Sequence, residues 1–454
     1  MFIKNTCDKN IKKWFNKMKK TIIVSYNFPP VGGAGVQRPV KFVKYLRDYS
    51  WEPLVLTVAN PSVPVIDRTL EKDIPSGVQI LKATTYEPSY QQKQGFKNTQ
   101  SNVTGSLKRI FKKIIFQFLL PDLQVLWWPG LVITLIKAIK TDRPDCLFVT
   151  APPFSSFAPV VVLGRIFGIP VVLDYRDEWS FSRNTWENSN KSRFASFVDS
   201  FMERFVISQC AAFTAANASY VDSLNKAYPQ SAIGKGTVIT NGYDDDDFEI
   251  MGTGSTENDD FKITLVYTGT VWAATSFQPI ITALQSLLAK LPELETRISL
   301  KIVGRVVDNE ALLFESDPIK NIVTLCGYLN HDRVIEELNS ADVLLLTLSD
   351  LPGAEKIITG KAFEYMASGK HVFAIVPEGE TKDLFCSNYD NVTIANPSDI
   401  SSIITGFKMI IEHIDDIRIR RGKATPQFLR RNLTAKLAEV FNTVTGKTAS
   451  LGGK

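Results

Sequence analysis

Short apolar runs that end at a glycine or polar loop and are followed by a helix recur through most of this chain. Residues 21–26 and 52–58 have the composition of strands, and the helical pattern of residues 36–46 lies between them. The order strand, helix, strand is typical of parallel α/β domains, which bind ligands beyond the carboxyl ends of their strands. The same order restarts at residues 262–267, so the sequence predicts an α/β fold made of two Rossmann-like domains.

The sequence between the two halves is acidic and rich in small polar residues. Asp244 to Asp247 is a run of four carboxylates, and GTGSTENDD follows at residues 252–260. Such composition is typical of a flexible linker. The predicted parts are a basic N-terminal arm at 1–20, a first domain at 21–243, a linker at 244–260, a second domain at 261–420, and a C-terminal helix and tail at 421–454.

Composition limits the class of protein. The chain has 454 residues, of which 44% are hydrophobic and 22% charged, as expected for a soluble protein of two domains. No apolar run approaches the roughly 20 residues that span a bilayer, and residues 1–20 lack a signal-peptide core, which predicts a cytoplasmic location. Five cysteines and three histidines show no metal-site spacing, so we expect no metal. A net charge of +5 is too small to indicate a nucleic-acid partner.

A loop rich in proline and glycine follows the first strand. It reads FPPVGGAGVQR from Phe28 to Arg38, and its backbone can approach a ligand closely at Gly32 and Gly33. The dinucleotide-binding fingerprint is incomplete, because Arg38 stands where a third glycine is needed. A tight turn that needs glycine for its backbone angles is the alternative.

Charged residues also end the strand at residues 169–173, which runs into the string DYRDEW. Its members include Asp174, Arg176 and Asp177. Buried charges are costly without partners, which favours a ligand site at this strand end. The alternative is a structural clamp between arginine and aspartate that holds the loop.

The segment TGKAFEYMASGK, residues 359–370, predicts a helix that Gly369 ends. Lys361 and Glu364 are three residues apart, so they share one face near the helix N-terminus, where free N–H groups favour an anion. The helix can offer a cation to phosphate and a carboxylate to hydroxyl groups, which suits a sugar nucleotide. An ordinary lysine–glutamate pair on a solvated face is the alternative.

These three strings, in this order and spacing, resemble retaining family 4 glycosyltransferases with the GT-B fold, over roughly residues 20–420. The resemblance implies two Rossmann-like domains that face a central cleft, with the acceptor on the first and a nucleotide diphosphate sugar on the second. It implies that Glu364 holds the nucleotide ribose. The other residues expected to bind the donor are Gly32, Gly33, Gly269, Gly304, Arg305 and Lys361.

The resemblance also assigns roles in the first domain. Arg176 and Asp177 are expected to be catalytic, with Asp177 orienting the attacking hydroxyl, and Arg38 and Asp174 are expected on the acceptor side. Arg305 has the alternative of an ordinary surface arginine. Two departures stand out: Lys356 occupies the place of a second glutamate upstream of the helix, and no histidine precedes His331.

The predicted function is a retaining, metal-independent glycosyltransferase of the hexosyltransferase type. It would move a sugar from a nucleotide diphosphate sugar, a co-substrate that needs no further cofactor, to a lipid-linked or polysaccharide acceptor in bacterial surface glycan synthesis. The alternatives are a non-catalytic nucleotide-sugar-binding scaffold and a nucleotide-sugar 2-epimerase. The sequence does not reveal the nucleotide base, the sugar, the acceptor or the linkage.

Two segments suggest peripheral contact with an anionic membrane at the inner face of the cell membrane. Residues 1–20 hold seven lysines against one aspartate. Residues 107–120 have an apolar helical stripe opposite four cations, which is typical of an interfacial helix. A surface helix whose stripe packs into the core is the alternative for residues 107–120.

Overall fold

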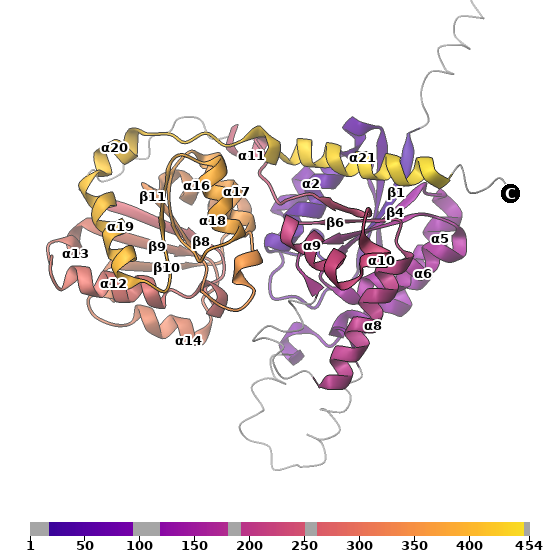
Figure 1. Cartoon of the computed structure of the whole chain (residues 1–454), viewed down its shortest axis with the longest axis horizontal. Coiled ribbons are helices and arrows are strands. Elements are labelled where there is room, and N and C mark those ends of the chain that lie inside the picture. Colours follow the sequence, from indigo (N-terminus) through magenta and orange to yellow (C-terminus); the bar gives the residue numbers. More distant parts are fainter. Residues whose placement is uncertain (1–17, 94–118, 180–191, 250–260, 449–454) are drawn as a thin grey trace, which may run out of the picture.

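The computed structural model describes residues 18–93, 119–179, 192–249 and 261–448, which form two α/β domains side by side (Figure 1). Each domain has one sheet whose strands are all parallel, in the orders β3-β2-β1-β4-β5-β6-β7 and β10-β9-β8-β11-β12-β13. The predicted fold class of two Rossmann-like domains is therefore confirmed. The strands are β1 Lys19–Val24, β2 Trp51–Val58, β3 Gln79–Ala83, β4 Cys146–Ala151, β5 Val171–Tyr175, β6 Ala212–Ala215, β7 Gly236–Val238, β8 Ile263–Thr268, β9 Ile298–Val303, β10 Val323–Gly327, β11 Val343–Thr347, β12 His371–Ile375 and β13 Val392–Ala395.

Helices cover both faces of the first sheet because its strands are apolar on both sides. One face packs against α5, α6 and α8, and the other packs against α2 and the C-terminal helix α21. The helices of this domain are α2 Gln37–Tyr45, α5 Trp128–Asp142, α6 Phe157–Phe167, α8 Arg193–Gln209, α9 Ala218–Ala227, α10 Pro229–Ala232, α11 Asp246–Glu249 and α21 Arg430–Thr448.

The second sheet is covered in the same way. Helices α12 and α19 pack on one face, and α16, α17 and α18 pack on the other. The helices of this domain are α12 Gln278–Leu288, α13 Leu294–Arg297, α14 Asp308–Ala311, α15 Ile319–Ile322, α16 His331–Ser340, α17 Gly360–Ser368, α18 Glu380–Asn388, α19 Ile400–Glu412 and α20 Ile414–Ile419.

The polar, irregular sequence of residues 61–104 predicts one long loop, and the structure corrects this prediction within residues 61–93. A short 3-10 helix spans Thr69–Asp73, and strand β3 adds to the edge of the first sheet beside β2. An edge strand keeps several side chains in contact with water, so β3 lacks the continuous apolar run that marks a buried strand.

The prediction of a flexible linker from residue 244 is wrong for its first part. Asp244 is buried, and residues 246–249 form helix α11. Ion pairs with lysines of α2 hold this acidic run against the first domain. Residues 250–260, most of the predicted arm at 1–20 and most of the predicted helix at 107–120 lie outside the described residues.

One described segment meets the length and hydropathy expected of a membrane-spanning helix, contrary to the expectation that no apolar run is long enough. This segment is Leu123–Asp142, which includes α5. One side of α5 packs on the first sheet through buried residues such as Leu131 and Leu135. The length and hydropathy of this segment alone therefore do not show that it crosses a membrane.

The carboxyl ends of the two sheets meet where the domains touch. The Tyr328 hydroxyl, just after β10, donates a hydrogen bond of 2.9 Å to Asp67 of the first domain. Lys72 pairs with Asp332 at 2.5 Å across the same boundary. Loops that follow strands of both sheets are therefore in contact, which is the arrangement in which α/β domains build a shared ligand site.

The chain crosses back after the second domain, and α21 completes the core of the first (Figure 1). Phe441 of α21 is fully buried, with its ring 5.1 Å from that of Trp51 and 5.6 Å from that of Phe148. The first domain therefore depends on residues that lie far away in the sequence.

We expect Phe441→Ala to lower the free energy of unfolding by about 3–5 kcal/mol, because it removes a buried aromatic side chain and leaves a cavity. Urea denaturation followed by tryptophan fluorescence would measure this, since Trp51 is adjacent. Leu312→Ala, at a side chain 65% exposed in the second domain, is the control and should change stability little. Equal stability of the two variants would contradict the role of α21.

Candidate functional site

The glycine loop after β1 has two positions that only glycine suits, for different reasons. Gly33 has a φ of 103°, and a Cβ there would have no neighbour within 4 Å, so its backbone is accessible. At Gly32 a Cβ would lie 2.7 Å from Val65 and 3.0 Å from the hydroxyl of Tyr328. Gly32 therefore allows close packing of the domains, while Gly33 leaves open backbone beside the second domain.

Two strands of the second domain also end at glycines with positive φ. Gly269 follows β8 with φ of 122°, and Gly304 follows β9 with φ of 144°. A Cβ at Gly304 would lie 2.1 Å from the carbonyl oxygen of Gly269, and a Cβ at Gly269 would lie 2.8 Å from Lys361 Nζ. These glycines let two strand ends and the lysine come together.

Helix α17 begins at Gly360, where the sequence predicts the anion-binding helix. Its N-cap, Thr359, makes no capping hydrogen bond, and the Thr359 Oγ1 atom is buried without a hydrogen-bond partner among the described residues. The first turn therefore keeps unsatisfied donors beside Lys361.

The ammonium group of Lys361 is placed to receive an anion. Its Nζ lies 3.8 Å from the ring centroid of Tyr267, and it has no hydrogen bond or ion pair within the described residues. Burial lowers the pKa of Lys361 to about 7, although the nearby charge of Glu364 opposes this shift. A bound phosphate would supply the missing negative charge.

Glu364 lies one turn further along α17 and connects the two domains. Its Oε1 accepts a 2.9 Å hydrogen bond from Gln37 Nε2, at the start of α2. The same Gln37 amide lies 3.3 Å from His331 Nδ1. A ligand that binds Glu364 would therefore also meet the first domain.

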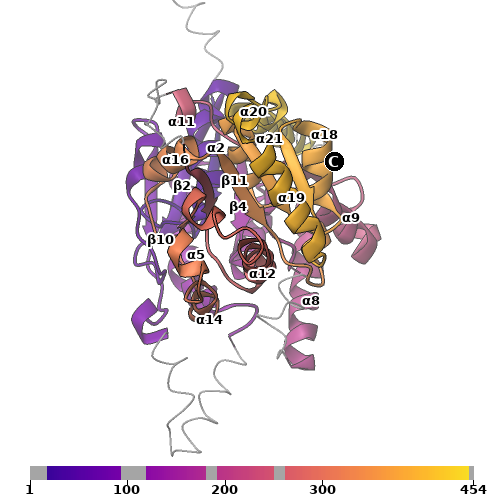
Figure 2. The same cartoon turned by 90° about the vertical axis from the view of Figure 1, so that its left-hand side faces the viewer.

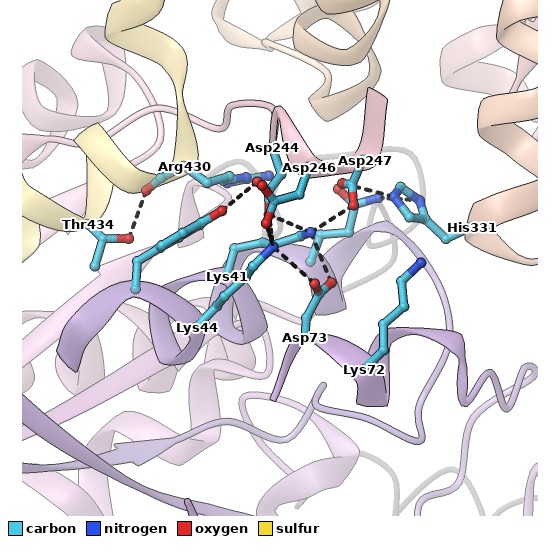
Figure 3. A network of polar contacts seen from close by, with 12 residues as sticks. Lys41, Lys44, Lys72, Asp73, Asp244, Asp246, Asp247, His331, Arg430 and Thr434 are labelled. Carbon is cyan, nitrogen blue, oxygen red and sulfur yellow. Dashed lines mark hydrogen bonds and ion pairs between the residues drawn. The ribbon is translucent and has the colours of Figure 1, made fainter. Parts of the chain in front are cut away.

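A buried network of charged groups stands beside this junction (Figure 3). Lys41 Nζ lies 2.9 Å from Asp73, 2.7 Å from Asp244 and 3.0 Å from Asp247. Asp247 also lies 3.1 Å from His331 Nε2. The acidic cluster already has a cation at its centre, so these residues form a structural ion-pair network, and they do not fit a metal site.

The network changes the protonation of its members. Although burial favours neutral imidazole, the hydrogen bond to Asp247 and the charges of Glu364 and Asp247 raise the pKa of His331. Burial would raise the pKa of Asp247, but the contacts with His331 and Lys41 lower it overall. The pair therefore favours an ionic contact between the linker and the second domain.

The acceptor-side role predicted for Arg38 and Asp174 requires correction. Arg38 donates to Asp174 at 2.7 and 3.0 Å, and the two side chains are 2% and 0% exposed. Thr150 and Thr214 donate to the remaining lone pairs of Asp174, each at 2.7 Å. Because this pair is buried and saturated, it is a structural clamp. The alternative left open for the DYRDEW string is also a clamp, but the arginine that binds Asp174 is Arg38 of the glycine loop.

Arg176 and Asp177 have different surroundings, although they are adjacent. Arg176 is buried and donates to the carbonyl oxygens of Ala151, Pro152 and Gly35, so it fixes loops, which corrects its expected catalytic role. Asp177 is exposed and has no hydrogen bond or ion pair in the described part of the chain.

Lys356, which replaces the glutamate expected from the resemblance, makes contacts across the domain boundary. Its Nζ lies 3.3 Å from Glu178 and 3.1 Å from Ser223, both in the first domain. Arg305, by contrast, is exposed at the end of β9, with a 3.5 Å contact to the hydroxyl of Tyr90. Arg305 remains a candidate phosphate ligand, but its position also fits an ordinary surface arginine.

Sequence reasoning missed three residues near Glu364. Gln37 lies in the glycine-loop string, directly before Arg38, and could have been noticed there. His331 follows the end of β10, where site residues are common. Arg430 gave no signal: it is 4% exposed, its Nη1 has no hydrogen-bond partner among the described residues, and burial lowers its pKa to about 10.

No protein-family model and no curated protein matches the sequence. Solved structures match in fold. Sucrose-phosphate synthase from Thermosynechococcus elongatus is 12% identical, with a TM-score of 0.58 over 95% of this chain and 98% of that one. HepE from Anabaena, in complex with UDP and glucose, is 13% identical, with a TM-score of 0.58 over 95% and 99%.

A UDP-GlcNAc 2-epimerase from Neisseria meningitidis, bound to UDP-GlcNAc, is also similar. It is 13% identical, with a TM-score of 0.51 over 93% of this chain and 100% of that one. At such identities the likeness concerns the fold. The chain has the GT-B fold, with its candidate site where the carboxyl ends of two parallel sheets meet.

Proposed function

We propose that this chain is a glycosyltransferase that uses a nucleotide diphosphate sugar. The observation that carries the proposal is the ammonium of Lys361, which has no ion-pair partner among the described residues and stands at the N-terminus of α17 beside Gly269. A cation and free backbone N–H groups suit a diphosphate, and Glu364 on the same helix suits ribose hydroxyls. Support comes from HepE, whose structure of similar fold contains UDP.

The reaction is proposed to retain configuration and to need no metal. The bond from the anomeric carbon to the diphosphate breaks, and a bond to the acceptor hydroxyl forms on the same face of the sugar. The hydroxyl proton passes to the departing phosphate oxygen, while Lys361 stabilises the charge that develops there. Asp177 orients the acceptor, because its carboxylate is accessible and can accept a hydrogen bond from the hydroxyl.

The acceptor is proposed to be a lipid-linked or polysaccharide chain of a bacterial surface glycan, built at the inner face of the cell membrane. Peripheral attachment through residues 1–20 and 107–120 belongs to this proposal. A 2-epimerase shares the fold. An epimerase would change the sugar without an acceptor, whereas a transferase releases nucleotide diphosphate when an acceptor is added, and a non-catalytic scaffold would bind the donor without turnover.

We expect one class of UDP-, GDP-, ADP- or dTDP-sugar to stabilise the protein in a thermal-shift panel. At 100 times its dissociation constant a ligand adds about 2.7 kcal/mol to the free energy of unfolding. Glu364→Ala should lose this stabilisation, because the ribose contact is removed. Glu355→Ala, at an exposed glutamate nearby, is the control and should respond like the wild type. If none of these nucleotide sugars raised the melting temperature of the folded wild type, the donor site would be refuted.

Donor affinity should also depend on pH through Lys361. With a pKa of about 7 in the free protein, Lys361 is charged at lower pH, and a bound diphosphate raises that pKa. Affinity should be constant below about pH 7 and fall by up to about tenfold per pH unit above it. Calorimetric titration with the nucleotide sugar would measure this. Lys361→Arg keeps its positive charge at these pH values, so the donor affinity of this variant should not change with pH. If its affinity fell above pH 7 as steeply as that of the wild type, Lys361 would be excluded as the cause of the pH dependence.

Asp177→Asn should separate binding from turnover. The neutral amide oxygen accepts a weaker hydrogen bond from the attacking hydroxyl than the carboxylate does. Release of nucleotide diphosphate with a membrane glycolipid fraction should therefore fall by about 100-fold or more. The donor-induced thermal shift should remain. Asp222→Asn, at an exposed aspartate of α9, is the control. Wild-type turnover in Asp177→Asn would remove this residue from the mechanism.

A further inference from the structure

Helix α8 exposes three phenylalanines in one stripe. Phe194, Phe197 and Phe201 are 59%, 67% and 63% exposed, and their spacing of three and four residues places them on the same side of the helix. In both views α8 projects from the first domain (Figures 1 and 2). Exposed aromatic side chains in a continuous stripe indicate an interaction surface.

In α8 the acidic side chains are buried and aromatic side chains are exposed, which is the reverse of the arrangement in an ordinary surface helix. The two acids of α8, Asp199 and Glu203, are 0% and 1% exposed, and Glu203 accepts a 2.9 Å hydrogen bond from the Tyr228 hydroxyl. Arg193 and Arg204 are exposed. The outward side of α8 therefore combines aromatic rings with positive charge and carries no exposed acid.

The neighbouring helices continue this surface. Helices α5, α6 and α8 lie next to one another on the same face of the first sheet, so their outward sides adjoin. Only 28% of the apolar segment that contains α5 is buried. The outward sides of these helices together form what we call the α5–α6–α8 surface. Its exposed apolar residues are Ile133, Val162, Ile166, Phe194, Phe197 and Phe201. Its exposed cations are Lys137, Lys140, Arg143, Arg165, Arg193 and Arg204.

We propose that the α5–α6–α8 surface binds an anionic lipid bilayer, with the α8 phenylalanines inserted below the headgroups and the cations on lipid phosphates. Charge decides between the possible occupants. A second copy of the chain would set one group of cations against an identical group, which is unfavourable in a symmetric dimer. An anionic bilayer has negatively charged headgroups that can pair with the cations of the α5–α6–α8 surface. Directly beneath the headgroups lie apolar chains that can take up the phenylalanines.

This surface consists of described residues and is separate from residues 1–20 and 107–120. The inference does not rest on the proposed donor chemistry, although a membrane-bound enzyme would reach a lipid-linked acceptor directly. The two can therefore fail independently: vesicle binding tests the surface, and the nucleotide thermal shift tests the site.

The test is flotation of the full chain with vesicles of phosphatidylcholine that contain about 30% phosphatidylglycerol, against pure phosphatidylcholine. We expect the wild type to bind the anionic vesicles. The triple variant Phe194→Ser, Phe197→Ser, Phe201→Ser should bind at least about tenfold more weakly, since it loses the inserted apolar area. The control is Leu312→Ser, Leu325→Ser, Ile419→Ser, three exposed apolar residues of the second domain, and it should bind like the wild type.

A second variant, Arg193→Gln with Arg204→Gln, should weaken binding and reduce its salt dependence. Both variants should keep the thermal stability of the wild type, because the altered side chains are exposed. Wild-type vesicle binding by the phenylalanine variant would overturn the proposal. Sedimentation that shows a wild-type dimer and a monomeric phenylalanine variant, with unchanged vesicle binding, would overturn it in favour of a second copy. A lower melting temperature of that variant, with unchanged vesicle binding, would overturn it in favour of a segment of this chain covering the stripe.

Discussion

The burial of Lys41 among three carboxylates is the interaction on which the junction of the two domains depends. A buried ammonium is costly unless acids surround it, and here the acids come from a 3-10 helix of the first domain and from the segment that leaves that domain. Asp247 extends the same network to His331 of the second domain. The start of the connection, residues 244–247, is therefore fixed by charge to both domains.

Helix α17, which carries the proposed donor site, differs from this network because its first turn lacks such partners among the described residues. Lys361 has an aromatic ring for a neighbour and, within the residues that the structure describes, no acid bound to its ammonium, whereas Glu364 accepts a hydrogen bond from the amide of Gln37. A ligand with a diphosphate and a ribose would satisfy the first group directly and compete with Gln37 for the second. In the proposed complex, ligand binding would therefore be coupled to the contact between domains, since both use the carboxylate of Glu364.

Short sequence motifs predicted those features of the fold that depend only on neighbouring residues. The strand ends, the glycines at Gly269 and Gly304 and the helix at Lys361 follow from short stretches of sequence, and the structure places them together. The Arg38–Asp174 pair could not be predicted, because its members lie 136 residues apart and only the parallel order of β1, β4 and β5 brings them together. For the same reason the charges of the DYRDEW string favoured a ligand site, whereas partners from other strands and loops make Asp174 and Arg176 structural.

Lys356 shows how a departure from a family pattern can be explained by its surroundings. The side chain at this position faces Glu178, which belongs to the DYRDEW string of the other domain. A glutamate at position 356 would set two carboxylates against each other at this boundary, with Glu178 only 4% exposed. Lysine turns that repulsion into an attraction, but it cannot accept hydrogen bonds from a sugar. Of positions 356 and 364, only Glu364 can therefore accept hydrogen bonds from hydroxyl groups in the proposed donor complex.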